Sequence, residues 1–251
     1  MSRYGWTPDV PDQRDHVYAL PPHIKKTRLP ASVDLRRACP PVYDQGDLGS
    51  CTANAIGAVM QFLQKRQKQK DFMPSRLGIY YEERKLEGTI NADAGAMIRD
   101  GIKVVNQFGV WPETLQPYDP SQFKKAPSRE CLTFGQEHQA VTYQRIDHTD
   151  LSLLKGRLAS GLPIVFGFSV YESFESAEVA RTGILKLPGK KEKMMGGHAV
   201  AAVGYNTAKK ALLVRNSWGP DWGLKGYFWM PFKYATDPNL ADDFWAITAV
   251  E

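Results

Sequence analysis

The chain has 251 residues, 43% of them hydrophobic and 24% charged, which is enough material for a large buried core. These proportions exclude intrinsic disorder over most of the length. The net charge is +5, but Lys and Arg form no single long run, and no apolar stretch is long enough to cross a bilayer. We therefore expect a folded protein that has neither a nucleic-acid nor a membrane partner.

The three cysteines, Cys39, Cys51 and Cys131, are far apart and contain no C-x-x-C pair. That spacing argues against a zinc knuckle or a thioredoxin-like redox site. At most one disulfide can form, so at least one thiol stays free and is a candidate nucleophile. The sequence has no Walker A, G-x-G-x-x-G or H-E-x-x-H motif, so we expect no metal and no nucleotide cofactor.

Residues 1–30 are expected to form an N-terminal arm. Five prolines interrupt any helix there, yet aromatic residues such as Tyr4 and Trp6 are too many for a purely solvated tail. We expect an extended segment that its aromatic rings pin to the rest of the protein. The N-terminus lacks the apolar segment of a signal peptide. The compartment is left open between the cytoplasm, secretion after removal of a leader, and export by another route.

Downstream of the arm, the apolar pattern predicts helices first and strands later. Ala55, Val59 and Phe62 recur at helical spacing after a start at about Cys51, and Gly109 is a stop signal for a later helix. The expected helices begin at about residue 51 and run over 75–86 and 96–108, followed by a long connection over 115–140. Short β-branched or aromatic runs predict strands over 163–170, 198–204, 211–215, 226–230 and 244–248. This order is typical of an α+β chain with two lobes.

Three distant segments carry residue types that act together in nucleophilic catalysis. Gln45 to Cys51 is a glycine-rich approach to a helix whose first turn holds a thiol, and the positive end of a helix favours the thiolate. His198 opens an apolar strand, and Asn216 follows another. A thiolate can attack a carbonyl, an imidazole can carry the proton, and an amide can orient the imidazole. His198 follows Cys51 by 147 residues and Asn216 follows it by 165, near the roughly 130–150 known for one class of Cys/His/Asn enzymes.

On these residues the sequence resembles the papain-like cysteine peptidases. The resemblance covers most of residues 31–250, and its most specific part is the run N-S-W-G-P-D-W-G-L-K-G-Y over 216–227. The arm, with G-W-T-P-D at 5–9, resembles the bacterial branch of that family. The family's fold implies a helical left lobe and an antiparallel, β-barrel-like right lobe with the active-site cleft between them, formed here by residues 31–251. The arm of residues 1–30 is then expected to border the cleft and to restrain access to it.

The resemblance implies a cysteine endopeptidase, a thiol protease that hydrolyses peptide bonds through a thioester on Cys51. His198 would be the general acid/base, Asn216 would orient it, and Gln45 would donate to the oxyanion together with the Cys51 N–H. Trp218 would shield the His198–Asn216 bond and border the primed side. The other implied substrate contacts are Gly49 at S1, Ala94 and Gly95 near S2 and S3, Gly197, and Ala199 in the S2 wall. The implied partner is a peptide or protein substrate, and we expect a monomer.

Two residues depart from the family's usual Cys-Gly-Ser-Cys-Trp motif. Leu48 replaces a half-cystine and Thr52 replaces an indole, which removes the family's usual disulfide but no catalytic atom. These changes leave an alternative open, namely a papain-like binding or scaffolding protein without turnover. Whether Cys39 and Cys131 form a disulfide is also left open.

Three acidic residues, Asp237, Asp242 and Asp243, lie in a region that approaches the floor of S2 in the family. A hydrated loop is the favoured interpretation. A carboxylate that faced the pocket would instead favour basic side chains at P2. The sequence leaves the natural substrate undecided.

Overall fold

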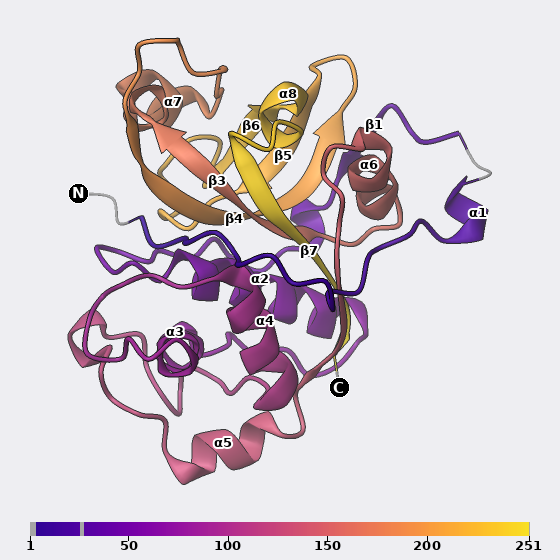
Figure 1. Ribbon diagram of the computed structural model, residues 1–251. Coiled ribbons are helices and arrows are strands. Elements are labelled where there is room, and N and C mark those ends of the chain that lie inside the picture. Colours follow the sequence, from indigo (N-terminus) through magenta and orange to yellow (C-terminus); the bar gives the residue numbers. More distant parts are fainter. Residues whose placement is uncertain (1–3, 26–27, 251) are drawn as a thin grey trace.

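The computed structural model describes residues 4–25 and 28–250. It has two lobes (Figure 1). The lower lobe in that view holds the helices α2 (Cys51–Arg66), α3 (Arg76–Leu86), α4 (Ile98–Gln107) and α5 (Arg129–Gly135), and the upper lobe holds most of a twisted sheet. The two-lobed α+β architecture predicted from the sequence is confirmed.

The sheet is antiparallel, and its strands follow the order β2-β7-β3-β4-β5-β6, with β1 paired to β4. The strands are β1 (Ser32–Asp34), β2 (Ala140–Arg145), β3 (Ile164–Tyr171), β4 (Met194–Asn206), β5 (Ala211–Arg215), β6 (Tyr227–Pro231) and β7 (Ala241–Val250). The long strand β4 pairs with β3 so that His198 lies opposite Phe168. The next residue, Ala199, belongs to the core cluster that also contains Cys51 of α2, so this part of β4 adjoins the helical lobe.

Helix α2 is buried on almost every side, because its first three turns consist largely of small and apolar residues. Ala53 and Ile56 belong to the same core cluster as Ala201 of β4 and Trp245 of β7. The helix therefore lies between the lobes, and its first residue, Cys51, is held at their junction.

Most of the predicted elements occur with boundaries shifted by a few residues. The expected connection over 115–140 is wrong in part, because it contains the 3-10 turn η2 (Pro120–Gln122) and the helix α5. Ser128 caps α5 by accepting a hydrogen bond from the Cys131 amide. Because few residues of this short helix are buried, its sequence lacks the apolar stripe that predicts a helix. The other short elements are α1 (Pro22–Lys25), η1 (Arg36–Ala38), α6 (Leu151–Ala159), η3 (Glu172–Glu175), α7 (Ala177–Thr182) and α8 (Phe232–Ala235).

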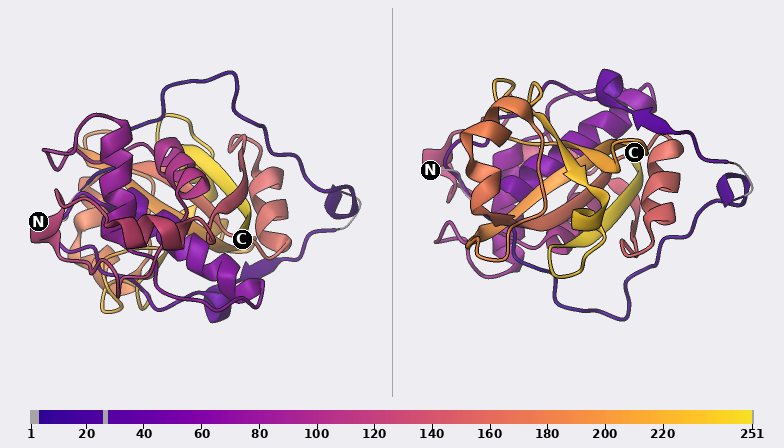
Figure 2. Two further views of the ribbon diagram at one scale, coloured as in Figure 1. Left: turned by 90° about the horizontal axis from the view of Figure 1, so that it is seen from below. Right: turned by 90° about the horizontal axis from the view of Figure 1, so that it is seen from above.

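The N-terminal arm runs as an extended segment between the two lobes (Figure 1). Trp6 forms a parallel bridge with Ala96, and Val17 forms another with Arg145. Further along, α1 stands apart from the body of the molecule (Figure 2). Across the described part of the chain, no helix combines the length and the apolar character needed to cross a membrane.

Candidate active site

Cys51 begins α2, and the residue is 0% exposed. Burial raises the pKa of its thiol to about 11, although hydrogen bonds from the backbone amides of Ala199, Gly5 and Thr52 act in the opposite direction. The thiol is therefore protonated at neutral pH while the site is closed in this way. The contact with the Ala199 amide brings the sulfur to β4 beside His198, and the contact with Gly5 brings it to the arm.

His198 is held by Asn216 in one defined orientation. Asn216 Oδ1 accepts from the Ser217 amide at 2.8 Å and lies 2.8 Å from His198 Nε2. Because that side-chain atom accepts from an amide, it is the oxygen, and the imidazole must donate to it through Nε2–H. His198 Nδ1 then carries the lone pair, and it has no hydrogen-bond partner among the described residues. Burial lowers the pKa of His198 to about 4, so the ring is neutral at pH 7.

Trp218 covers this histidine. The rings of Trp218 and His198 are 5.0 Å apart at their centroids and 29° apart in plane, which is a stacked arrangement. Trp222 meets Trp218 edge-on at 5.3 Å, and Phe174 lies 5.2 Å from Trp218 at a tilted angle. Trp218 is thus packed between His198 and two further aromatic rings.

Ser217 connects Gln45 to Asn216 by hydrogen bonds. The sequence did not indicate a role for Ser217. Ser217 Oγ donates to Gln45 Oε1 at 2.6 Å, and the Gln45 amide donates to Ser217 O at 2.9 Å. Gln45 Nε2 donates to Leu48 O at 2.9 Å. The side-chain amide of Gln45 is thus fixed at both ends beside the residue that also orients Asn216.

The segment expected to contact substrate near S2 and S3 pairs with the arm in this structure. Ala94 is exposed, and the amide of Gly95 donates to the Tyr80 hydroxyl at 3.1 Å. At this edge, Ala96 makes the main-chain pairing with the arm. Gly95 has φ 74°, a left-handed conformation that turns the chain and presents the next residue to the cleft.

The arm passes directly over the thiol. Ala96 N donates to Gly5 O at 2.7 Å, and Trp6 N donates to Gly197 O at 3.0 Å, so the arm is hydrogen-bonded to both lobes. A Cβ on Gly5 would lie 1.8 Å from Gly49 O, which means that only glycine fits there. Gly49, Gly197 and Cys51 therefore all lie beneath arm residues in this structure.

The indole of Trp6 fills a pocket whose floor is Asp243. Trp6 Nε1 donates to Asp243 Oδ2 at 3.0 Å, and a Cβ on Gly167 would lie 2.0 Å from the ring. Asp243 is 0% exposed and has φ 56°, an unusual backbone conformation for a residue with a side chain. The favoured interpretation of Asp243 as part of a hydrated loop is therefore wrong. Its charge is compensated by Arg145, whose Nη2 lies 2.8 Å from Asp243 Oδ1.

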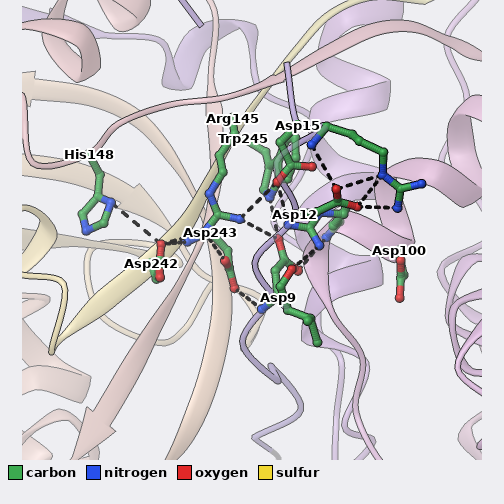
Figure 3. A network of polar contacts seen from close by, with 12 residues as sticks. Asp9, Asp12, Asp15, Asp100, Arg145, His148, Asp242, Asp243 and Trp245 are labelled. Atoms are coloured by element: carbon green, nitrogen blue, oxygen red, sulfur yellow. Dashed lines mark hydrogen bonds and ion pairs between the residues drawn. The ribbon is translucent and has the colours of Figure 1, made fainter. Parts of the chain in front are cut away.

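A network of carboxylates and guanidinium groups fastens the arm next to this pocket (Figure 3). Asp9 Oδ2 accepts from Trp245 Nε1 at 2.9 Å, and Asp9 Oδ1 accepts from the Arg99 amide at 3.0 Å. Arg99 Nη2 also lies 2.6 Å from Asp15 Oδ2. Burial and the neighbouring charge of Asp243 raise the pKa of Asp9 to about 7, against the effect of these donors. Two acidic residues of the arm thus anchor it to both lobes.

The remaining cysteines take no part in this arrangement. Cys39 and Cys131 are free thiols, which settles the question that the sequence left open about a disulfide between them. Cys39 Sγ donates to Leu35 O at 3.5 Å, and Cys131 Sγ accepts from Ser128 Oγ at 3.3 Å.

Comparison with known proteins places this fold and site in one class. A family model described as papain family cysteine protease matches residues 29–244. The chain therefore belongs to the papain family of cysteine proteases, and it is a peptidase, as expected from the sequence.

Within that class, the chain is similar to xylellain, a cysteine protease from Xylella fastidiosa. The two share 45% identity, the match covers 100% of this chain and 97% of the xylellain chain, and the TM-score is 0.92. An uncharacterized peptidase C1-like protein of Acanthamoeba polyphaga mimivirus is 44% identical over 98% of this chain and 87% of its own length. Cathepsin K of Gallus gallus is 30% identical over 80% of this chain and 58% of its own length. A procathepsin B from Trypanosoma congolense, at 18% identity and a TM-score of 0.77, shares the fold.

Proposed function

We propose that Cys51, His198, Asn216 and Gln45 are the catalytic residues of this peptidase. The observation that carries the proposal is the state of His198: Asn216 holds its Nε2–H, so Nδ1 keeps a lone pair that can take the thiol proton. The thiolate of Cys51 would then attack the peptide carbonyl. The Cys51 N–H and the side-chain amide of Gln45 would donate to the oxyanion.

The second half of the reaction follows from the same geometry. His198 returns its proton to the leaving amine, which breaks the C–N bond and leaves a thioester on Cys51. His198 next takes a proton from water, the hydroxide adds to the thioester carbonyl, and the thiolate leaves. Trp218 keeps competing water from the His198–Asn216 bond throughout.

The test is hydrolysis of a mixed peptide substrate by Cys51→Ala, with Cys39→Ala and Cys131→Ala as matched controls. We expect Cys51→Ala to lose cleavage while it keeps its melting temperature, and the two control variants to keep cleavage. Undiminished cleavage by Cys51→Ala would remove the thiol from the mechanism. Absence of cleavage by the native chain, with the arm displaced, would instead favour the alternative of a papain-like binding protein without turnover.

We also propose that the arm of residues 1–30 inhibits this site until it is displaced. The support is steric, because Gly5 lies against Gly49 and hydrogen bonds to the Cys51 sulfur, where a substrate carbonyl would have to sit. The site is also chemically silent in this state, since burial raises the pKa of the thiol and lowers that of His198. Displacement would return water to both groups and allow a thiolate–imidazolium pair to form.

The direction of the arm explains why it would block the site without being cut. Tyr4 lies near Trp218, on the side expected to bind the primed part of a substrate, and Trp6 lies beside Ala96, on the side of S2 and S3. A substrate places its N-terminal residues in S2 and S3, so the arm runs in the opposite direction. Its carbonyl groups are then oriented away from the attack geometry that hydrolysis requires.

A further inference from the structure

The loop from Gln45 to Ser50 carries the oxyanion donor and leads into the nucleophile, yet it has no covalent brace. Leu48 occupies the place where the resemblance expects a half-cystine, and all three cysteines are free thiols. A donor to an oxyanion contributes to catalysis only when it is held in place before the charge develops. Some non-covalent contact must therefore fix this loop.

A chain of hydrogen bonds through Tyr118 connects the two ends of this loop. Tyr118 Oη donates to Gln45 O at 2.8 Å, and since a phenol has a single proton, it must accept from Ser50 Oγ, 2.6 Å away. Ser50 Oγ in turn accepts from Asn54 Nδ2 at 3.1 Å. One phenol oxygen thus joins the first residue of the loop to the last.

The side chain of Ser50, at the start of α2, makes this contact in place of a helix cap. Serine before a helix normally accepts from a backbone amide of the first turn, but the Ser50 side chain makes no such cap. Its hydroxyl serves Tyr118 and Asn54 instead. The Ser50 hydroxyl is therefore used to hold the loop and not to cap the helix.

A buried arginine anchors the other end of this hydrogen-bond chain, at Asn54. Arg76 Nη1 donates to Asn54 Oδ1 at 3.0 Å and to Asp44 O at 2.8 Å, just before the loop. Its guanidinium lies 3.9 Å from the centre of the Tyr118 ring and is paired with Glu113, with Nε 2.6 Å from Oε1. The ring of Tyr118 is therefore fixed as firmly as its hydroxyl.

We infer that Tyr118 is a positioning residue for catalysis, which holds Gln45 in the geometry that receives the oxyanion. The inference rests on the proposed role of Gln45. Tyr118 touches neither substrate nor thiol; it acts through the backbone carbonyl of Gln45 and the hydroxyl of Ser50.

The experiment compares Tyr118→Phe with Tyr205→Phe, each made in the full chain, with kcat expressed per active site titrated by an epoxide thiol trap. Tyr205 is the matched control, because its buried hydroxyl donates to a backbone carbonyl, Pro30 O, at 2.7 Å. We expect Tyr118→Phe to lower kcat about three- to tenfold with little change in KM, and Tyr205→Phe to leave kcat unchanged. We expect the two substitutions to lower the melting temperature by similar amounts.

The decisive step is to repeat Tyr118→Phe in a Gln45→Ala background. If Tyr118 acts through Gln45, its loss should have no further effect there. An unchanged kcat for Tyr118→Phe, or the same fold-loss with and without Gln45, would overturn the inference. A Gln45→Ala variant with full kcat would instead refute the oxyanion role itself. Should Tyr118→Phe fail to fold, Ser50→Ala tests the same oxygen from its other side, with the same two outcomes.

Discussion

The indole N–H of Trp6 donates to the buried carboxylate of Asp243 at 3.0 Å, across 237 positions of sequence. This single bond links the N-terminal arm to the last strand of the sheet, at the floor of the pocket that the arm fills. Trp6 is itself only 8% exposed. Trp6 is thus part of the core around the site and not an appendage.

Trp6→Ala should release the arm and raise the initial rate of peptide hydrolysis about tenfold or more. Truncating a buried indole typically costs about 3–5 kcal/mol, and here that loss falls on the closed state alone. Val17→Ala is the matched control, because Val17 lies on the same arm with a side chain that is 70% exposed. A Trp6→Ala rate equal to that of the native chain would show that the arm does not limit access.

The closed state should weaken as the pH rises towards neutrality. The pKa of Asp9 is about 7 when the arm is bound, against an ordinary value of 3.8. Between these values the closed state holds one more proton than the open state, so opening releases a proton and is favoured by higher pH. The stabilisation is complete below about pH 4 and is lost as the pH passes through about 7.

Hydrogen exchange at the Trp6 and Thr7 amides measures this opening, in a Cys51→Ala background that prevents self-cleavage. We expect the ratio of opening constants between that protein and its Asp9→Asn derivative to rise up to about tenfold per pH unit over this range. Taking the ratio cancels the titration of His198, which is common to both. Asp12→Asn is the control, since Asp12 pairs with the exposed Arg14, and a ratio independent of pH would contradict the prediction.

Glu83 should make the whole protein less stable at high pH. It is completely buried under α2, accepts from Thr52 Oγ1 at 2.8 Å, and burial raises its pKa well above the ordinary value of 4.5. Protonation of Glu83 favours the folded state. This contribution to stability is complete below pH 4.5 and is lost as the pH rises through the raised pKa of Glu83. The melting temperature of Glu83→Gln relative to native should therefore increase with pH. Glu178→Gln, at an exposed ion pair, should show no such trend, and parallel curves for Glu83→Gln and native would refute the account.

Local pattern was sufficient to predict the helix that carries Cys51 and the strands that carry His198 and lead to Asn216. Apolar spacing set the α2 stripe, and short β-branched runs bounded by turn residues set β4 and β5. The proposed catalytic residues then followed from residue type and order along the chain, together with the resemblance.

The parts that could not be predicted depend on contacts between distant residues. The sequence indicates a solvated Asp243, and its burial is compensated by contacts with Arg145, Trp6 and the Asp9 amide, all of them distant in the sequence. The pairing of Ala96 with the arm follows the left-handed turn at Gly95, which composition does not reveal. Helix α5 has too few buried residues to produce a periodic signal.

The arm buries Cys51, and we propose that it thereby keeps a catalytic thiol protonated. The direct measurement is the rate at which iodoacetamide alkylates Cys51 across pH, in chains that lack Cys39 and Cys131, with and without Trp6→Ala. We predict slow labelling that still increases at alkaline pH with Trp6 present. With Trp6→Ala, labelling should be about tenfold faster or more and already near its maximum below about pH 7. The same slow rate and the same pH profile in both proteins would contradict the account.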